Sequence, residues 1–222
     1  MIYKMLPLLA LLLMPAVSKT DNTTPITTTV TTASAAETVY HSLNSNNFNL
    51  PSMASFEQAF EGFERLKEKG LVEKDILTIV DFSLSSNQKR LWVIDMTTHT
   101  VLFHSLVAHG RNTGNEFATK FSNKSESNQS SLGFYATGEI YTGKHGKSLR
   151  LDGLEKGVND NARNRAVVIH GADYVSESFI RNHSRLGRSL GCPALPVELN
   201  AKIIEVIKEK SCLFIYHPSR QA

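Results

Sequence analysis

The chain has 222 residues, of which 41% are hydrophobic and 20% are charged, so it is long enough for one globular domain with a sizeable core. Its formal net charge of +3 is small, and no dense block of Lys and Arg is interleaved with aromatic residues. These features argue against a nucleic-acid partner.

Residues 1–18 (MIYKMLPLLALLLMPAVS) have the pattern of a secretory signal peptide. Lys4 precedes an apolar run, and Ala16 and Ser18 are the small residues that a signal peptidase prefers. The run is short for a membrane-spanning helix, so an uncleaved anchor is the less favoured alternative. We therefore expect a periplasmic or secreted protein, associated with the cell envelope and held by no membrane segment after cleavage.

Two segments are expected between the signal peptide and the main domain. Residues 19–50 are rich in Thr, Ser and Asn, which predicts a flexible linker. Residues 51–72 are expected to contain a helix that packs on the following domain, with Ser52 as its N-cap. Its apolar residues recur at steps of three and four: Met53, Phe56, Phe60, Phe63 and Leu66.

Residues 73–218 are expected to form the main domain, which is mainly β with peripheral helices (α+β). Apolar runs rich in β-branched and aromatic residues predict strands near 76–82, 89–95, 100–109, 131–135, 166–169 and 212–217. The first three are joined by short polar turns and should form an antiparallel meander. Helical spacing predicts further helices at 175–182 and 196–210.

The chain contains two cysteines, Cys192 and Cys212, and eight histidines. In an exported protein two cysteines can form a disulfide, which would fit a non-catalytic wall-binding module stapled by that bond. The alternative is a reactive Cys192 and a buried Cys212 inside an apolar strand. No HExxH or CxxC motif is present, so we expect no metal and no cofactor.

The segment from 165 to 193 pairs a histidine with a cysteine. His170 ends an apolar strand and is followed by Gly171, while Gly191 precedes Cys192 and allows a sharp turn. A cysteine attacks an acyl carbon as its thiolate, so it needs a nearby base and N–H donors for the oxyanion. A single His/Cys pair is a weak signal, however, because most proteins contain one.

The runs around this pair make the pattern far more specific. IHGADYV and SLGCPAL resemble the His-Gly and Ser/Thr-x-Gly-Cys motifs of the YkuD-type L,D-transpeptidase catalytic domain. Further runs, including LVAHGRNTG, YTGKHG and NDNARNRAVVIHGADYVSESFI, resemble the second YkuD-like subfamily of murein L,D-transpeptidases. The resemblance implies a β-sandwich-like domain with helices at its edge.

The resemblance also implies roles for individual residues. Cys192 would be the nucleophile and His170 its base, oriented by the Gly171 carbonyl or a nearby hydroxyl. Gly191 and Cys192 would give the oxyanion N–H groups, and Ser189 matches the Ser/Thr before the turn. The family's second His is replaced by Leu190 and its polar residue after the Cys by Pro193, so we expect substrate contacts from other residues: Arg111, Tyr141, His145 and Arg188.

The implied activity is a transferase reaction in cell-wall biogenesis. A thioester acyl-enzyme would form on peptidoglycan stem peptides, and the amine of a second stem would resolve it into a 3–3 cross-link. Two alternatives use the same site: an L,D-carboxypeptidase with water as acceptor, and an enzyme that anchors proteins to peptidoglycan. The sequence does not choose among these acceptors.

Overall fold

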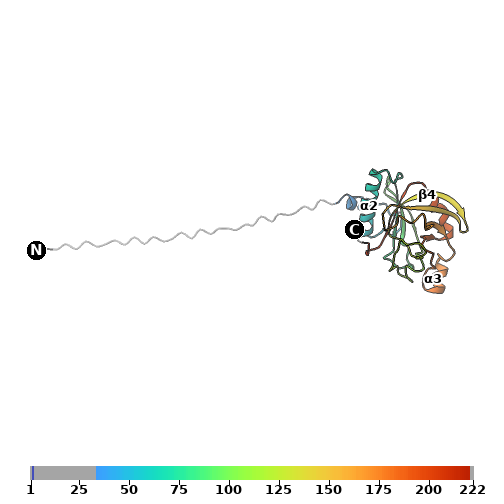
Figure 1. The fold of residues 1–222 in the computed structure, drawn as a ribbon. Coiled ribbons are helices and arrows are strands. Elements are labelled where there is room, and N and C mark those ends of the chain that lie inside the picture. Colours follow the sequence, from blue (N-terminus) through green and yellow to red (C-terminus); the bar gives the residue numbers. More distant parts are fainter. Residues whose placement is uncertain (1, 3–33, 221–222) are drawn as a thin grey trace. The chain divides into compact units, whose positions relative to one another are not determined.

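The computed structural model describes residue 2 and residues 34–220 (Figure 1). The predicted signal peptide therefore lies outside the described residues, apart from Ile2, and so does the linker as far as residue 33. Within the described part, eight strands form one sheet in the order β3-β2-β1-β8-β4-β5-β6-β7. The strands are β1 Ile76–Asp81, β2 Leu91–Asp95, β3 Thr100–Ser105, β4 Gly133–Gly143, β5 Gly146–Gly153, β6 Val168–Gly171, β7 Ala194–Leu195 and β8 Cys212–Tyr216. The helices are α1 Ala35–His41, α2 Met53–Glu68, α3 Glu177–His183 and α4 Val197–Ile207.

The parallel pair β1 and β8 lies inside the sheet, and its side chains are buried on both faces. Successive side chains of a strand point to opposite faces, so both faces must be apolar. Leu213 and Ile215 of β8 enter one core cluster, while Phe214 enters the other. This explains why the last predicted strand is an uninterrupted apolar run rather than an alternating one.

The two faces of the sheet are covered by α2 and α4. Ser52 caps α2, accepting a hydrogen bond from the Ser55 N–H, and the buried Phe56 and Phe63 join the cluster on one face. Helix α4 buries Ile203 and Ile207 against the other face. Figure 1 shows α2 at one side of the domain and the long β4–β5 hairpin at the opposite side.

The expected mainly β fold with peripheral helices is confirmed, and the β1–β2–β3 meander is antiparallel as predicted. The sandwich-like shape arises from one curved sheet rather than from two separate sheets. Ala194 of β7, at one end of the sheet, forms an antiparallel bridge with Ala108, which follows β3 at the other end. The sheet is therefore nearly closed into a barrel, and its two ends meet where the predicted Cys192 turn begins.

The expectation of a flexible linker is wrong for residues 34–50. Helix α1 begins after Ser34, which accepts a hydrogen bond from the Glu37 N–H, and it packs against α2. The Tyr40 hydroxyl donates to the Pro51 carbonyl at 2.8 Å, and the buried Trp92 indole donates to the Asn49 carbonyl at 2.7 Å. These tertiary contacts order a segment whose own composition is too polar to fold alone. Among the described residues, no helix is long and apolar enough to cross a bilayer.

A buried Arg–His pair connects this core to the loop after β3. Arg90 is fully buried and donates to the carbonyls of Leu84 and Val107 and to His109 Nδ1, the last at 2.8 Å. Because His109 Nδ1 accepts this bond, its Nε2–H is left to donate to the Gly114 carbonyl at 3.3 Å. Burial and the Arg90 charge lower the pKa of His109 to about 4, so the imidazole is neutral at pH 7.

This neutral histidine should make stability depend on pH. In the unfolded chain an ordinary histidine titrates near 6.5, so below that pH the unfolded state binds a proton that folded His109 does not take up until about pH 4. Between pH 6.5 and pH 5 this should remove roughly 2 kcal/mol of unfolding free energy. We expect His109→Gln to reduce the difference in unfolding free energy between pH 7 and pH 5 by that amount, as measured by urea titrations at the two pH values. His41→Gln, at an exposed position in α1, is the control, and an unchanged pH dependence in His109→Gln would contradict the prediction.

Candidate active site

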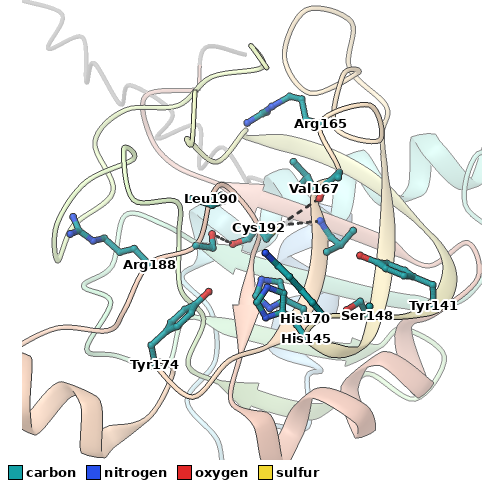
Figure 2. A pocket seen from close by; sticks show the side chains of 15 residues that line it. Tyr141, His145, Ser148, Arg165, Val167, His170, Tyr174, Arg188, Leu190 and Cys192 are labelled. Carbon is teal, nitrogen blue, oxygen red and sulfur yellow. Dashed lines mark hydrogen bonds between the residues drawn. The ribbon is translucent and has the colours of Figure 1, made fainter. Parts of the chain in front are cut away.

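The predicted histidine and cysteine line the same cavity, which has a volume of about 480 Å³. Its walls come from the tip of the β4–β5 hairpin, the start of β6, the segment after β6 and the turn before β7. Figure 2 shows Cys192, His170 and His145 close together in this cavity. The 21 residues that separate His170 and Cys192 in sequence are bridged by the parallel pairing of His170 with Ala194.

The turn that carries Cys192 is held by the Ser189 hydroxyl. Ser189 Oγ donates to the Cys192 carbonyl at 2.6 Å and accepts from the Gly191 N–H at 3.0 Å. Between them, Gly191 has a φ of +127°, which only glycine adopts without strain. Ser189 therefore closes the turn, and Gly191 makes it possible.

One expectation about this turn is wrong. The Gly191 N–H was expected to face a substrate oxyanion, but it is already bonded to Ser189 Oγ. A backbone donor has one proton, so this group serves the turn and not the cavity. The N–H of Cys192 remains as the expected oxyanion donor.

The loop after β3 fixes the position of the turn. The Ser189 N–H donates to the His109 carbonyl at 3.0 Å, and the Arg111 N–H donates to the Ser189 carbonyl at 2.8 Å. On the other side of the turn, Ser130 Oγ donates to the Gly191 carbonyl at 3.1 Å and accepts from the Gly110 N–H at 3.0 Å. The buried Arg90–His109 pair is therefore linked to the turn that carries Cys192 through one backbone hydrogen bond.

His170 is held in one tautomer. Its Nδ1 lies 3.0 Å from the Gly171 carbonyl oxygen, which can only accept, so Nδ1 carries the proton and Nε2 has a free lone pair. The ring of His145 stacks on it with 4.4 Å between centroids. Burial lowers the pKa of His170 below its ordinary value, the Gly171 carbonyl raises it, and His145 and Lys144 lower it further. The imidazole is therefore neutral near pH 7.

The Cys192 thiol contacts the chain at the start of β6. Sγ accepts a hydrogen bond from the Val168 N–H at 3.4 Å and donates to the Ala166 carbonyl at 3.7 Å. Burial raises the pKa of this thiol, whereas the Val168 N–H and the charges of Arg165 and Lys144 lower it. Burial is the largest of these effects, so the resting side chain is a neutral thiol.

The disulfide alternative is wrong, because both cysteines are free. Cys212 lies in the central strand β8, where it is fully buried in the cluster beneath α2. Burial raises its pKa well above that of an ordinary thiol. It behaves as a small apolar core residue, as one of the two sequence interpretations expected.

Three of the four predicted substrate contacts line the cavity: Tyr141, His145 and Arg188. Arg111 does not, because it braces the turn through its backbone while its side chain is exposed. Sequence reasoning missed Lys144 at the hairpin tip, Arg165 before β6 and Tyr174 after it, although each lies inside a run that resembles the family. No Asp or Glu is among the lining residues, so the cavity is cationic.

Residues 49–216 match the family model of the L,D-transpeptidase catalytic domain. The chain belongs to this family. The match includes α2, which therefore belongs to the L,D-transpeptidase domain, whereas only the last two residues of the segment expected to be a linker lie within the match. No curated protein sequence matches the chain.

The chain is also similar to solved structures, at low sequence identity. An L,D-transpeptidase from Mycobacterium smegmatis is 12% identical with a TM-score of 0.39, and the match covers 64% of this chain and 59% of that one. The helical cell shape determining protein Pgp2 from Campylobacter jejuni is 14% identical with a TM-score of 0.43, covering 68% of this chain and 54% of that one. The chain thus matches a little over half the length of each of these proteins.

Metal-ligating side chains do not gather in the L,D-transpeptidase domain. Within residues 34–220, no group of three or more His, Cys, Asp and Glu side chains is arranged to hold a metal ion. His170 and His145 stack on each other and share the cavity with cations rather than carboxylates.

Substituting Gly191 should disable the turn. A Cβ at this position would lie 2.8 Å from the Gln129 carbonyl oxygen, in a backbone conformation that L-residues rarely adopt. We expect Gly191→Ala to displace Cys192 and lower the rate of acyl-enzyme formation about 100-fold, the usual cost of a misplacement near 1 Å. Gly157→Ala is the matched control: Gly157 also has a positive φ, of +78°, but a Cβ there meets nothing within 4 Å. Equal losses in both variants would contradict the argument.

Proposed function

We propose that this chain is a cysteine-dependent murein L,D-transpeptidase that forms 3–3 cross-links in peptidoglycan. The observation that carries the proposal is the shared cavity of Cys192 and His170, in which the Gly171 carbonyl leaves His170 Nε2 as an unprotonated base. Membership of the L,D-transpeptidase family supports the same chemistry.

In the proposed first step, His170 Nε2 takes the proton of Cys192 as Sγ attacks the carbonyl carbon of the L,D peptide bond between the third and fourth stem residues. The Cys192 N–H stabilises the oxyanion. The C–N bond then breaks, the imidazolium returns the proton to the departing amine of the D-residue, and a thioester remains. In the second step, an amine of another stem attacks the thioester, the peptide bond forms and the thiol is restored.

The charge of the cavity supports a carboxylate-bearing substrate. Lys144, Arg165 and Arg188 line it, and no acidic side chain does. A stem tetrapeptide ends in a carboxylate, which such cations attract. We infer that Tyr141 and His145 at the hairpin tip contact the donor peptide. The family acts outside the cytoplasm, which agrees with the signal peptide predicted for residues 1–18, and we propose that the mature protein is periplasmic or secreted.

Water or a protein amine could replace the second stem as acceptor, which would make the protein an L,D-carboxypeptidase or an enzyme that anchors proteins to peptidoglycan. With a volume of about 480 Å³, the cavity can hold groups larger than water beside Cys192. This volume favours a transferase over a hydrolase.

The proposal is tested by the products formed on isolated peptidoglycan. We expect the purified protein to produce 3–3 cross-linked dimers, detected by mass spectrometry after muramidase digestion. Cys192→Ala should form none and should retain its fold, because losing a nucleophile costs chemistry rather than core packing. Cys212→Ala, which removes a buried thiol far from the chemistry, should remain active after a modest loss of stability. Tripeptides without dimers would refute the transferase, and dimers made by Cys192→Ala would refute the nucleophile.

The tautomer and surroundings of His170 also predict a pH profile. Protonated His170 cannot accept the thiol proton, and burial lowers its pKa, so kcat/KM should fall only as the pH drops below 6.5. The raised pKa of Cys192 places the alkaline limb above pH 9, where the pair has lost the proton needed by the leaving amine. Steady-state kinetics on a soluble tetrapeptide donor would measure both limbs. An acid limb above pH 6.5 would show that His170 is not the base.

A further inference from the structure

The segment from Arg165 to Val168 surrounds the proposed nucleophile with three different groups. Ala166 gives a carbonyl acceptor for the S–H, Val168 gives an N–H donor for the sulfur, and the Arg165 side chain lines the same cavity. Ala166 has a positive φ of +54°, unusual for a residue with a side chain. This strained torsion immediately precedes the Ala166 carbonyl that accepts from Sγ.

Arg165 is fixed in place without any carboxylate partner. Nη1 donates to the Ser122 carbonyl at 2.8 Å and to the Ser131 hydroxyl, while Nη2 donates to the Gln129 carbonyl at 2.6 Å and to the Ser127 hydroxyl at 3.3 Å. None of the ion pairs formed by residues 34–220 includes Arg165. All its partners are neutral, so its full positive charge remains available to a nearby anion.

Two residues earlier on the same loop, Arg163 shows the opposite arrangement. It is exposed, forms a bidentate pair with Glu139 at 3.0 and 3.1 Å, and also pairs with Asp152. Its charge is neutralised by two carboxylates, and it does not line the cavity. The charge of Arg163 is therefore neutralised, whereas the charge of Arg165 can act on a thiolate. Both arginines anchor the same loop.

The guanidinium of Arg165 lies against the residue that precedes Cys192. Its Nη2 is 3.4 Å from the position that a Cβ on Gly191 would occupy. Figure 2 shows Arg165 above Cys192, on the side of the cavity away from His170. The base and the fixed cation thus approach the sulfur from different directions.

We propose that Arg165 is a positioning residue for the nucleophile: its guanidinium, held by neutral groups of residues 122–131 and lying against Gly191, favours the thiolate form of Cys192 over the thiol. This inference rests on the proposed role of Cys192. In the resting state the S–H donates to the Ala166 carbonyl. When His170 removes the proton, the sulfur retains the Val168 N–H and gains the attraction of Arg165.

Other charged and titratable groups also face this thiol, and a test must separate them from Arg165. They belong to the β4–β5 hairpin, to β6 with the segment after it, and to the nucleophile turn: Tyr141, Lys144, His145, His170, Tyr174 and Arg188. The charges of Arg165 and Lys144 both lower the pKa of Cys192, against the larger effect of burial. Burial raises the pKa of Tyr174 to about 12, so its hydroxyl stays neutral and adds no charge over the working range.

The experiment is the pH profile of Cys192 alkylation by iodoacetamide in the purified full chain, with Cys192→Ala as the blank for the buried Cys212. Arg165→Gln removes the charge and should raise the midpoint of the profile by about one pH unit, the usual effect of a nearby opposite charge. Arg165→Lys retains a cation, so its midpoint should lie close to that of the unmodified chain. Arg163→Gln, the matched control, should weaken the loop without moving the midpoint.

Several outcomes would overturn the proposal. An Arg165→Gln midpoint equal to that of the unmodified chain, or an equal shift in Arg163→Gln, would reduce Arg165 to a structural anchor of the loop. If Arg165→Gln does not fold, Arg165→Lys decides: a shift of a full pH unit despite the retained charge would refute the electrostatic role. Alkylation requires no turnover, so a chain with the expected midpoints but no cross-linked products would refute the proposed function alone.

Discussion

The site depends on the close approach of two backbone segments at Gly110 and Gly191. A Cβ on Gly110 would lie 2.9 Å from the Gly191 Cα and 2.6 Å from the Asn128 carbonyl oxygen, so any side chain at position 110 would clash with the backbone. This contact brings the loop after β3 against the turn that carries Cys192. The hydrogen bonds of Ser189 and Ser130 then hold both segments in place. The position of the sulfur thus follows from glycine at two sites far apart in sequence.

The same closure explains why the cavity lies where it does. The curved sheet ends at β7 on one side and continues from β3 to Ala108 on the other, and the bridge between Ala108 and Ala194 joins these ends. Cys192 precedes this junction by two residues, while β6, paired with β7, carries His170. The buried Arg90–His109 pair stabilises the loop that completes the junction. A fully buried arginine without a carboxylate contact is costly, so the hydrogen bonds of Arg90 to the Leu84 and Val107 carbonyls and to His109 must offset the lost hydration.

Much of the fold could be predicted from the sequence, since periodicity and turn residues are local properties. The helix begun by Ser52 and the final buried strand are examples. The resemblance also led to His170 and Cys192. What local patterns could not reveal was which side chains reach the cavity: Arg111 does not line it, while Arg165 does. The folding of residues 34–50 was missed for a related reason, because that segment is ordered by α2 and Trp92 rather than by its own composition.

The charges around the cavity have opposite effects on the ionisation of Cys192 and of His170. The cations around the cavity favour a negative sulfur, whereas Lys144 and His145 disfavour a positive imidazole. The neutral thiol and neutral imidazole are therefore the resting state, and forming the ion pair requires compensation for the new positive charge on His170. A carboxylate of a bound stem peptide that pairs with Lys144 would ease the protonation of His170, while Arg165, bonded only to neutral groups, would still stabilise the thiolate. In the proposed mechanism, the arrival of an anionic donor and the activation of Cys192 are thus coupled through the same electrostatic field.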